Sequence, residues 1–389
     1  MISHAGTTAV ELDRLLTFGP DSYPVTIVSG PGAVDDLARR LAGLAADRFV
    51  LVADTGVPPE IRGLILECLR DYGPVTVCEL SPGEGNKTLA AAGAVMTAAF
   101  REGATRRSVV VAMGGGQAGN IAGLAAALMF RGPVRLLHIP TTLLALSDSV
   151  VSRKQAVNLG GTEGTAQVKN TVGAFKTPEA VWADLRMLRY LPADEIRSGL
   201  CEAVKNLVAI LPELAPEFAA LFRPTADYTD PELIQVIDMC LSAKQAVMRH
   251  DPCEKGEGLI LEYGHTAGHA IELACGIRHG FAIGIGGLVA ARVARILGLP
   301  GADGTAGLHE RLLRRIGAPV AVPPGIADET WTGLLLHDNK RGYRPIAPAD
   351  VEMVLLEGPG IPHCTGGLPL TQVPAAVVLQ AIRETERAA

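Results

Sequence analysis

Residues 108–132 read SVVVAMGGGQAGNIAGLAAALMFRG, and this stretch decides the fold class. It passes from a short β-branched run to a longer run of Ala and Leu that is typical of a helix. Between the two, Gly114, Gly116 and Gly119 match G-x-G-x-x-G, a spacing that lets backbone N–H groups and a helix N-terminus hold a pyrophosphate. The stretch predicts a nucleotide-binding unit, although a tight turn with close helix packing would need the same glycines.

Similar β-branched runs lie on both sides of this stretch, and segments of helical period separate them. They are PVTIV (24–28), FVLVAD (49–54), PVTVCEL (74–80) and PVRLLHIP (133–140). Strands that are apolar throughout and alternate with helices predict a parallel sheet covered on both faces. Ligands of such sheets bind at the carboxyl ends of the strands.

From about Pro192 the sequence changes to long stretches of helical spacing. We therefore predict an α/β fold class with two domains. A Rossmann-like parallel-sheet domain should cover residues 1–184, and a mainly helical domain that binds metal and substrate should cover residues 185–389. The active site is expected in the cleft between them.

Composition narrows the class of protein. The chain has 389 residues, a net charge of −6 and no long block of Lys and Arg, so nothing predicts a nucleic-acid partner. It has no basic start followed by an apolar core, and no apolar run of about 20 residues, so we expect a soluble cytoplasmic protein without a membrane segment. Seven widely spaced cysteines without C-x-x-C predict reduced thiols.

The glycine loop lacks one expected partner. An acid about 20 residues further on ordinarily holds the ribose hydroxyls, but here the next strand ends in Pro140, Thr141 and Thr142. Asp54, at the end of another strand, could hold the ribose instead, or it could be a turn residue. Glu84 and Lys87, in the turn SPGEGNKT, could reach the same nucleotide.

The stretch LEYGHTAGHAIE (261–272) sets His265 and His269 four residues apart, so on a helix both project from one face. His279 follows just past the expected helix end. Glu202 lies at the start of an apolar helical stretch, SGLCEAVKN, where a buried acid is costly unless it binds a cation or a donor. A glutamate and two histidines are typical of a catalytic zinc-type site, although spacing alone allows separate structural roles.

A third group of polar residues lies in DSVVSRKQAVNLGG (148–161) and QVKNTVGAF (167–175), which we interpret as loop-like. Lys and Asn together suit a phosphate or a polyhydroxyl ligand, and a solvated surface turn is the alternative. The group contains Asp148, Lys154, Asn158, Lys169 and Asn170.

Taken together, these motifs resemble the dehydroquinate synthase superfamily, the sugar phosphate cyclases. The resemblance runs from about Asp54 to Lys340 with the motifs in order. It is carried by GGGQAGNIAG, FRG, PTTLLALSDSVVSRKQAVN, KNTVGAF, GLCEAVKN, GHTAGHAIE and RHG.

The resemblance implies a role for each candidate residue. A divalent metal, Co²⁺ or Zn²⁺, would be held by Glu202, His265 and His279, and His269 would be a catalytic residue that faces the substrate. Lys154 and Lys205 would also be catalytic. The substrate would be bound by Asn158, Lys244, Lys340 and, from the neighbouring subunit of a homodimer, Arg131. To these substrate residues we add Asp148 from the third group of polar residues. NAD would be held by Glu84, Lys87, Gly115, Gly116, Thr141, Thr142 and Lys169. To these cofactor residues we add Asp54 from the end of its strand, and Gly114 and Asn120 from the glycine loop.

Three departures from the dehydroquinate synthase pattern indicate which enzymes of the superfamily this chain resembles most. Gly258 stands where those enzymes carry an Arg that binds the substrate carboxylate, Glu262 stands where they carry Asn, and Asn120 where they carry Asp. Loss of a guanidinium implies a substrate without a carboxylate. The motifs look like those of the cyclases that convert D-glucose 6-phosphate to 2-deoxy-scyllo-inosose and phosphate, the carbocycle of 2-deoxystreptamine aminoglycosides.

In that branch C4 is oxidised transiently with NAD, phosphate is eliminated, C4 is reduced again, and an aldol step closes the ring. Glu262 is a candidate general base at C5, although the leaving phosphate could remove the proton itself, or Glu262 could be a helix N-terminal acid. Alternatives are a cyclase for sedoheptulose 7-phosphate or DAHP, a metal-dependent polyol dehydrogenase and a nucleotide sensor without chemistry. His363 and Cys364 are expected to be structural.

Overall fold

The computed structural model describes residues 9–160 and 168–387. Their contacts divide the chain into two compact units. The first comprises Met1–Pro192 and Thr229–Asp238, and the second comprises Ala193–Tyr228 and Met239–Ala389. The segment that begins helix α7 (Asp230–Met248) thus belongs to the first unit although it comes late in the sequence.

The first unit is built on a seven-stranded sheet in the order β1-β2-β9-β6-β5-β3-β4. Its strands are β1 (Ala9–Phe18), β2 (Asp21–Ser29), β3 (Phe49–Asp54), β4 (Val75–Leu80), β5 (Val109–Gly114), β6 (Arg135–Pro140) and β9 (Ala180–Asp184). Its helices are α1 (Ala33–Leu44), α2 (Pro59–Arg70), α3 (Leu89–Arg101) and α4 (Gly116–Leu128). A hairpin of β7 (Lys154–Leu159) and β8 (Val168–Phe175) forms a separate two-stranded sheet.

The sheet departs from the predicted parallel arrangement at one edge. Strand β1 was not predicted, and it pairs with β2 in an antiparallel hairpin, whereas β2 and the other strands are parallel. Charged residues interrupt the apolar pattern of AVELDRLLTF, and the pairing shifts register between Val10 and Leu12. Both features obscure the two-residue period by which a strand is recognised.

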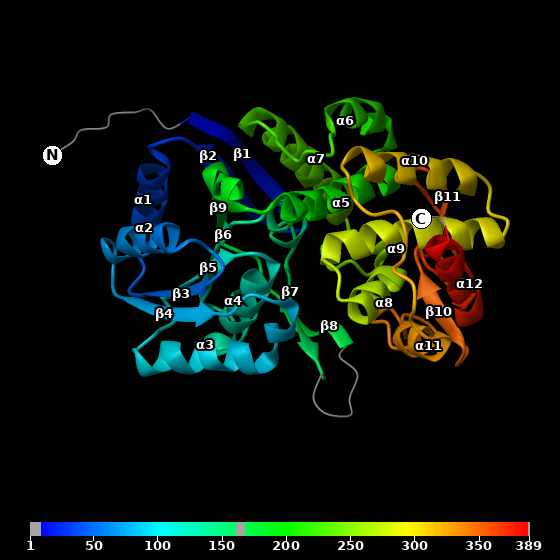
Figure 1. The fold of residues 1–389 in the computed structure, drawn as a ribbon. Coiled ribbons are helices and arrows are strands. Elements are labelled where there is room, and N and C mark those ends of the chain that lie inside the picture. Colours follow the sequence, from blue (N-terminus) through cyan, green and yellow to red (C-terminus); the bar gives the residue numbers. More distant parts are fainter. Residues whose placement is uncertain (1–8, 161–167, 388–389) are drawn as a thin grey trace. The chain divides into compact units, whose positions relative to one another are not determined.

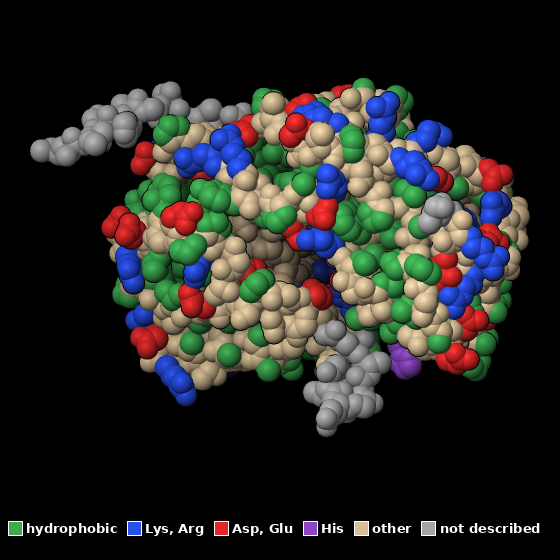
Figure 2. Space-filling view, in the orientation of Figure 1, with side chains coloured by type: hydrophobic (Ala, Val, Ile, Leu, Met, Phe, Trp, Pro, Cys, Tyr) green, Lys and Arg blue, Asp and Glu red, His purple; other side chains and the backbone are tan. Residues whose placement is uncertain are grey.

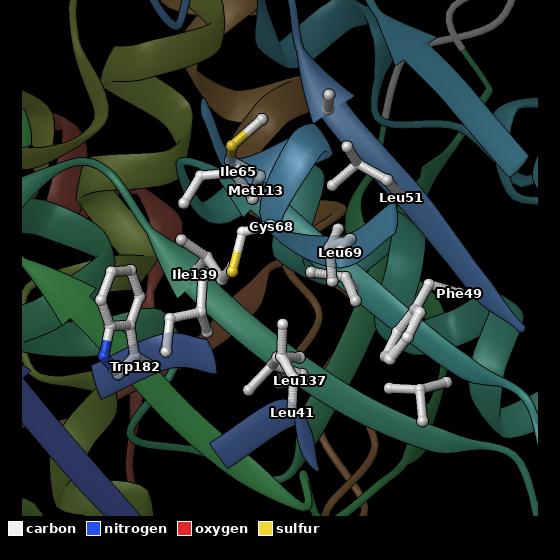
Figure 3. Packing of buried hydrophobic residues seen from close by; sticks show 14 of the residues in the cluster. Leu41, Phe49, Leu51, Ile65, Cys68, Leu69, Met113, Leu137, Ile139 and Trp182 are labelled. Carbon is white, nitrogen blue, oxygen red and sulfur yellow. The ribbon is translucent and has the colours of Figure 1, made fainter. Parts of the chain in front are cut away.

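The sheet of the first unit is covered on both faces, as the apolar strands predicted. Successive residues of one strand enter opposite cores: Phe49 and Leu51 pack with α1 and α2, whereas Val50 and Val52 pack with α3 and α4. Figure 1 shows the two helix pairs on opposite sides of the sheet. Figure 3 shows the first core closely, with Trp182 of β9 beside Ile139 of β6.

The second unit is mainly helical. Its helices are α5 (Ala193–Ala209), α6 (Ala215–Leu221), the remainder of α7, α8 (His265–Cys275), α9 (His279–Ile296), α10 (Ala302–Arg315), α11 (Asp328–Leu336) and α12 (Ala375–Glu386). Two small antiparallel sheets, which the sequence did not predict, pair β10 (Asp350–Met353) with β13 (Thr371–Pro374) and β11 (Leu356–Gly358) with β12 (Ile361–Pro362).

Helix α9 is central to the second unit. Among the described residues it is the one helix whose length and composition would allow it to cross a membrane, but 72% of it is buried inside the structure. Burial of that extent is typical of a core helix. On the surface, Figure 2 shows acidic and basic side chains interspersed on the visible face of each unit.

Two histidines in the cores should make stability depend on pH. Burial lowers the pKa of His138 in β6 and of His309 in α10 to about 4, against 6.5 for an unperturbed histidine. Each is therefore neutral in the folded chain but gains a proton on unfolding below pH 6.5. Stability should fall as the pH drops from 6.5 to 4, by up to about 3 kcal/mol for each histidine.

Urea unfolding across this pH range measures the effect, and the variants His138→Gln and His309→Gln should each show a shallower loss. A midpoint that does not change with pH in the parent chain would contradict the assignment.

Candidate active site

The carboxyl ends of three neighbouring strands in the first unit bring the predicted cofactor residues together. Asp54 ends β3, the glycines 114–116 follow β5, and Thr141 and Thr142 follow β6. The Thr141 N–H donates to the carbonyl of Gly114 at 3.0 Å, so the two loops are tied to each other. Asp54 Oδ1 accepts from the Gly56 N–H at 2.8 Å, which gives this residue the turn role considered above as an alternative.

Gly114 is required by close approach. A Cβ at this position would lie 2.7 Å from Cβ of Asp54 and 2.9 Å from Cβ of Ala118, and its φ is +151°. The variant Gly114→Ala should therefore displace the start of α4, weaken the NAD binding that the sequence predicts for this loop, and destabilise the first unit by roughly 1–3 kcal/mol.

A titration of NAD by fluorescence measures this change. Gly93→Ala in α3 is the matched control, since nothing lies within 4 Å of a Cβ there. Equal NAD affinity in Gly114→Ala and the parent chain would contradict the role of this loop.

A second polar group, centred on Glu84, follows strand β4. Lys169 Nζ lies 3.3 Å and Lys87 Nζ lies 3.8 Å from Glu84 Oε1, and Asn158 Nδ2 donates to the same oxygen at 3.1 Å. Lys87 Nζ also donates to Asn170 Oδ1 at 2.6 Å. Two ammonium groups beside one carboxylate can serve both the phosphates and the ribose of a nucleotide.

The loop-like interpretation of residues 148–175 is wrong for most of the segment. Lys154 begins β7 and Asn158 lies near its end, while Lys169 and Asn170 lie in β8. Asp148 lies in a short π-helical turn, Ala145–Ser149. Residues 161–167 fall outside the described residues. Polar residues interrupt the alternation of both strands, so their pairing across the hairpin was not evident from sequence.

Two asparagines predicted to contact ligands are already engaged by the protein. Asn120 Nδ2 donates to Gly116 O at 2.8 Å, and its Oδ1 accepts from the Ala156 N–H at 2.7 Å, so it joins α4 to β7. Asn158 Oδ1 accepts from the Asn170 N–H at 3.0 Å.

Arg131, predicted to contact the substrate of a neighbouring subunit, is exposed at the end of a helical turn, where its φ is +67°.

Three helices of the second unit bring Glu202, His265 and His279 together. The sequence had suggested that Glu202 lies at the start of a helix, but it lies in the middle of α5. His265 is the first residue of α8, and His279 is the first residue of α9. Gly280 permits this approach: its N–H donates to Ser198 Oγ at 3.1 Å, and a Cβ would lie 1.9 Å from the Ser198 carbonyl oxygen. Any larger residue would separate α9 from α5.

The three side chains fit a metal ion. One ligand atom from each lies within 4.8 Å of the others, and no other such group of His, Cys, Asp and Glu occurs among residues 9–160 and 168–387. Ligands of a tetrahedral ion at about 2.1 Å would be roughly 3.4 Å apart. Glu202 is fully buried, with Lys205 Nζ 2.6 Å from Oε2 and no hydrogen-bond donor to Oε1 in the described structure. A buried carboxylate oxygen of this kind needs a cation or a donor.

The two histidines of this group present a ring nitrogen to it. His265 Nδ1 lies 3.3 Å from the carbonyl oxygen of Tyr263, and His279 Nε2 lies 3.7 Å from Glu202 Oε1. When the Nδ1–H of His265 donates to this carbonyl, the lone pair of the neutral ring is on Nε2. Burial holds the pKa of His265 well below its usual value, so this imidazole is neutral, as a metal ligand must be.

A buried group of charges adjoins His269. Lys340 Nζ lies 3.0 Å from Asp338 and 3.3 Å from Glu262 Oε2, and Asp338 Oδ2 lies 3.8 Å from His269 Nδ1. Burial would lower the pKa of Lys340, but the two carboxylates outweigh it and raise that pKa overall. Burial lowers the pKa of His269, and Asp338 opposes this without cancelling it.

His269 is therefore a neutral imidazole. Its Nε2 is buried and has no hydrogen-bond partner in the described part of the chain. The ring centres of His269 and His265 are 5.3 Å apart, so His269 lies beside a candidate metal ligand.

Lys244, also predicted to bind substrate, is buried on α7 within the second unit.

Sequence reasoning missed two acids of this site. Asp338 is separated from His269 by 69 residues of sequence, and its one signal was its place two residues before Lys340. Glu272 accepts a hydrogen bond from His279 Nδ1 at 2.8 Å, and it follows His269 by three residues on α8. That helical spacing was a usable signal for Glu272.

Two family models match adjoining parts of the chain. The family model described as 3-dehydroquinate synthase N-terminal matches residues 77–198, and that described as 3-dehydroquinate synthase C-terminal matches residues 199–341. The 2-deoxy-scyllo-inosose synthase of Streptoalloteichus tenebrarius is 45% identical over 374 residues, which are 95% of this chain and 94% of that protein. The same enzyme of Streptomyces lividus is 44% identical over 370 residues, which are 94% of each.

Solved structures with a similar fold point to the same family as the sequence relatives do. A crystal structure of 2-deoxy-scyllo-inosose synthase complexed with carbaglucose-6-phosphate, NAD⁺ and Co²⁺ superposes with a TM-score of 0.85 at 36% identity, covering 96% of this chain and 100% of that chain. The 2-epi-5-epi-valiolone synthase of Streptomyces hygroscopicus, with NAD⁺ and Zn²⁺ bound, shares the fold with a TM-score of 0.73 at 22% identity, covering 97% and 100%. These matches extend over nearly the whole chain. The chain therefore belongs to the 3-dehydroquinate synthase superfamily and, within it, to the family of the 2-deoxy-scyllo-inosose synthases.

Proposed function

We propose that this enzyme converts D-glucose 6-phosphate to 2-deoxy-scyllo-inosose and phosphate. The observation that carries the proposal is the group Glu202, His265 and His279 beside the buried His269 and the partly buried Glu262, in a chain 45% identical to a 2-deoxy-scyllo-inosose synthase. Loss of phosphoric acid from the substrate leaves the product, and NAD is regenerated, so no other reactant is needed.

The proposed reaction requires two bound groups. Glu202, His265 and His279 would hold the metal, and the glycine loop with Asp54, the Glu84 group and the Thr141 loop would hold NAD. When bound, the metal stabilises negative charge on a sugar oxygen, and NAD exchanges a hydride with C4. The structural relative that binds carbaglucose-6-phosphate also binds NAD⁺ and Co²⁺.

The residues around Lys340 would move the protons. Glu262 is the candidate base for the C5 proton, because its carboxylate is nearly buried, with 16% of the side chain exposed, and Lys340 lies 3.3 Å away. Removal of that proton puts the electron pair into a new C5–C6 double bond as phosphate leaves C6. His269, neutral with an unpartnered Nε2, can accept or donate a proton at a sugar hydroxyl.

Position 258 bears on substrate choice. The Gly258 N–H donates to Asp251 Oδ2 at 2.9 Å, and a Cβ here would lie 2.7 Å from that oxygen. An arginine therefore does not fit unless Asp251 moves. The loop offers no guanidinium at this point, which suits a hexose phosphate rather than a substrate with a carboxylate.

Parallel assays with glucose 6-phosphate, sedoheptulose 7-phosphate and DAHP, each with NAD and Co²⁺, test the proposal. We expect phosphate release from glucose 6-phosphate at a kcat/KM at least about tenfold above the others, because each misplaced group costs about 1–3 kcal/mol. Net accumulation of NADH without phosphate would instead indicate a polyol dehydrogenase.

We propose further that the enzyme acts as a cytoplasmic homodimer in which Arg131 reaches the substrate phosphate of the neighbouring subunit. The exposure of Arg131 supports this. Mixed dimers of inactive Arg131→Ala and Lys205→Ala chains should regain activity, because one of the two sites would then be intact. No recovery in verified mixed dimers would exclude the shared site.

A further inference from the structure

Helix α8 carries three polar side chains on one stripe. His265, His269 and Glu272 are spaced by four and three residues, so they follow one another along the same side of the helix. The proposed function uses the two histidines and gives Glu272 no role. Yet only 10% of the Glu272 side chain is exposed, and a nearly buried carboxylate needs a partner.

One partner of Glu272 is a candidate metal ligand. Glu272 Oε2 lies 2.8 Å from His279 Nδ1, while Nε2 of the same ring lies 3.7 Å from Glu202 Oε1. A neutral imidazole has one N–H. When Nδ1 donates it to the carboxylate, the lone pair is left on Nε2, at the side of the ring that approaches Glu202.

His279 also needs a restraint that its backbone does not supply. It is the first residue of α9, and 24% of its side chain is exposed, whereas Glu202 is fully buried. A side chain at a helix start can adopt other rotamers toward solvent, and the hydrogen bond to α8 selects one of them. His265, by comparison, is restrained by its own neighbour, the Tyr263 carbonyl.

We propose that Glu272 is a positioning residue for the metal: it fixes the tautomer and the orientation of His279, and through them it sets metal affinity. This inference rests on the proposed function, because it takes Glu202, His265 and His279 as the ligands. Carboxylates that orient a histidine ligand generally contribute 10–100-fold to metal affinity.

The second unit offers a matched control. His363 Nδ1 and Glu357 Oε1 form the same kind of pair at 2.7 Å, with 24% of the His363 side chain exposed. His363 does not belong to the candidate metal group. Loss of Glu357 therefore removes an equivalent hydrogen bond without touching a ligand.

The test measures Co²⁺ affinity of the metal-free full-length protein by competition with a chromogenic chelator, together with the ligand-field spectrum of bound Co²⁺. Glu272→Ala should raise the Kd for Co²⁺ by about 10–100-fold and alter the spectrum, while the metal-free protein keeps its circular dichroism. Glu272→Gln, whose amide oxygen can still accept from Nδ1, should fall between Ala and the parent. Glu357→Ala should bind Co²⁺ as the parent does.

Equal affinity of Glu272→Ala and the parent would overturn the inference, as would an equal loss in Glu357→Ala. If Glu272→Ala does not fold, Glu272→Gln decides by the same criterion. A parent protein that binds no Co²⁺ would instead overturn the metal site of the proposed function, so the two failures are distinguishable.

Discussion

Glu262→Gln is expected to lower the rate of phosphate release from glucose 6-phosphate by about 10²–10⁴-fold, the usual contribution of a general base. Glutamine preserves the size of the side chain and its contact with Lys340, but it cannot accept the C5 proton. Since binding should change little, the loss should appear in kcat rather than in KM.

Glu257→Gln is the matched control for this prediction. It changes an exposed acid in the same 3₁₀ turn, Glu257–Glu262, and it should leave the rate unchanged. A Glu262→Gln enzyme with the full rate would show that the leaving phosphate removes the proton itself.

Removal of the metal is expected to have the second large effect. Chelation should lower phosphate release by at least about 10³-fold, because Lewis-acid stabilisation supplies several kcal/mol and each 1.36 kcal/mol is a factor of ten. Co²⁺ or Zn²⁺ should restore the rate, whereas Mg²⁺ should not, since two of the three candidate ligand side chains are imidazoles.

His265→Ala should resist such rescue because one of the proposed ligands is lost. The circular dichroism of this variant should match that of the metal-free parent. An enzyme indifferent to chelators would remove Glu202, His265 and His279 from their proposed role.

Local patterns in the sequence predicted much of this architecture. Gly114 and its neighbours marked the strand–turn–helix unit, because a glycine there is forced by close packing against Asp54. The four-residue spacing of His265 and His269 placed both on one helix, and the structure has them on α8. Such signals come from residues within one or two helical turns of each other, where the spacing determines the direction in which their side chains point.

Features that depend on distant residues could not be predicted in this way. The β7 and β8 hairpin is defined by pairing rather than by an alternating pattern, and Asp338 meets Lys340 and His269 only through tertiary structure. The packing of residues 229–238 with the first unit also depends on residues that are distant in the sequence. The resemblance to a known family supplied residue roles that spacing had left open.

In the proposed reaction, hydride leaves C4 of glucose 6-phosphate and returns to the same carbon while phosphate is lost. Turnover of glucose 6-phosphate deuterated at C4, with NAD well below the substrate concentration, tests this directly by mass spectrometry of the product. We predict 2-deoxy-scyllo-inosose that retains its deuterium, with one phosphate released per molecule. Product without deuterium, or deuterium that accumulates in reduced NAD, would contradict the claim.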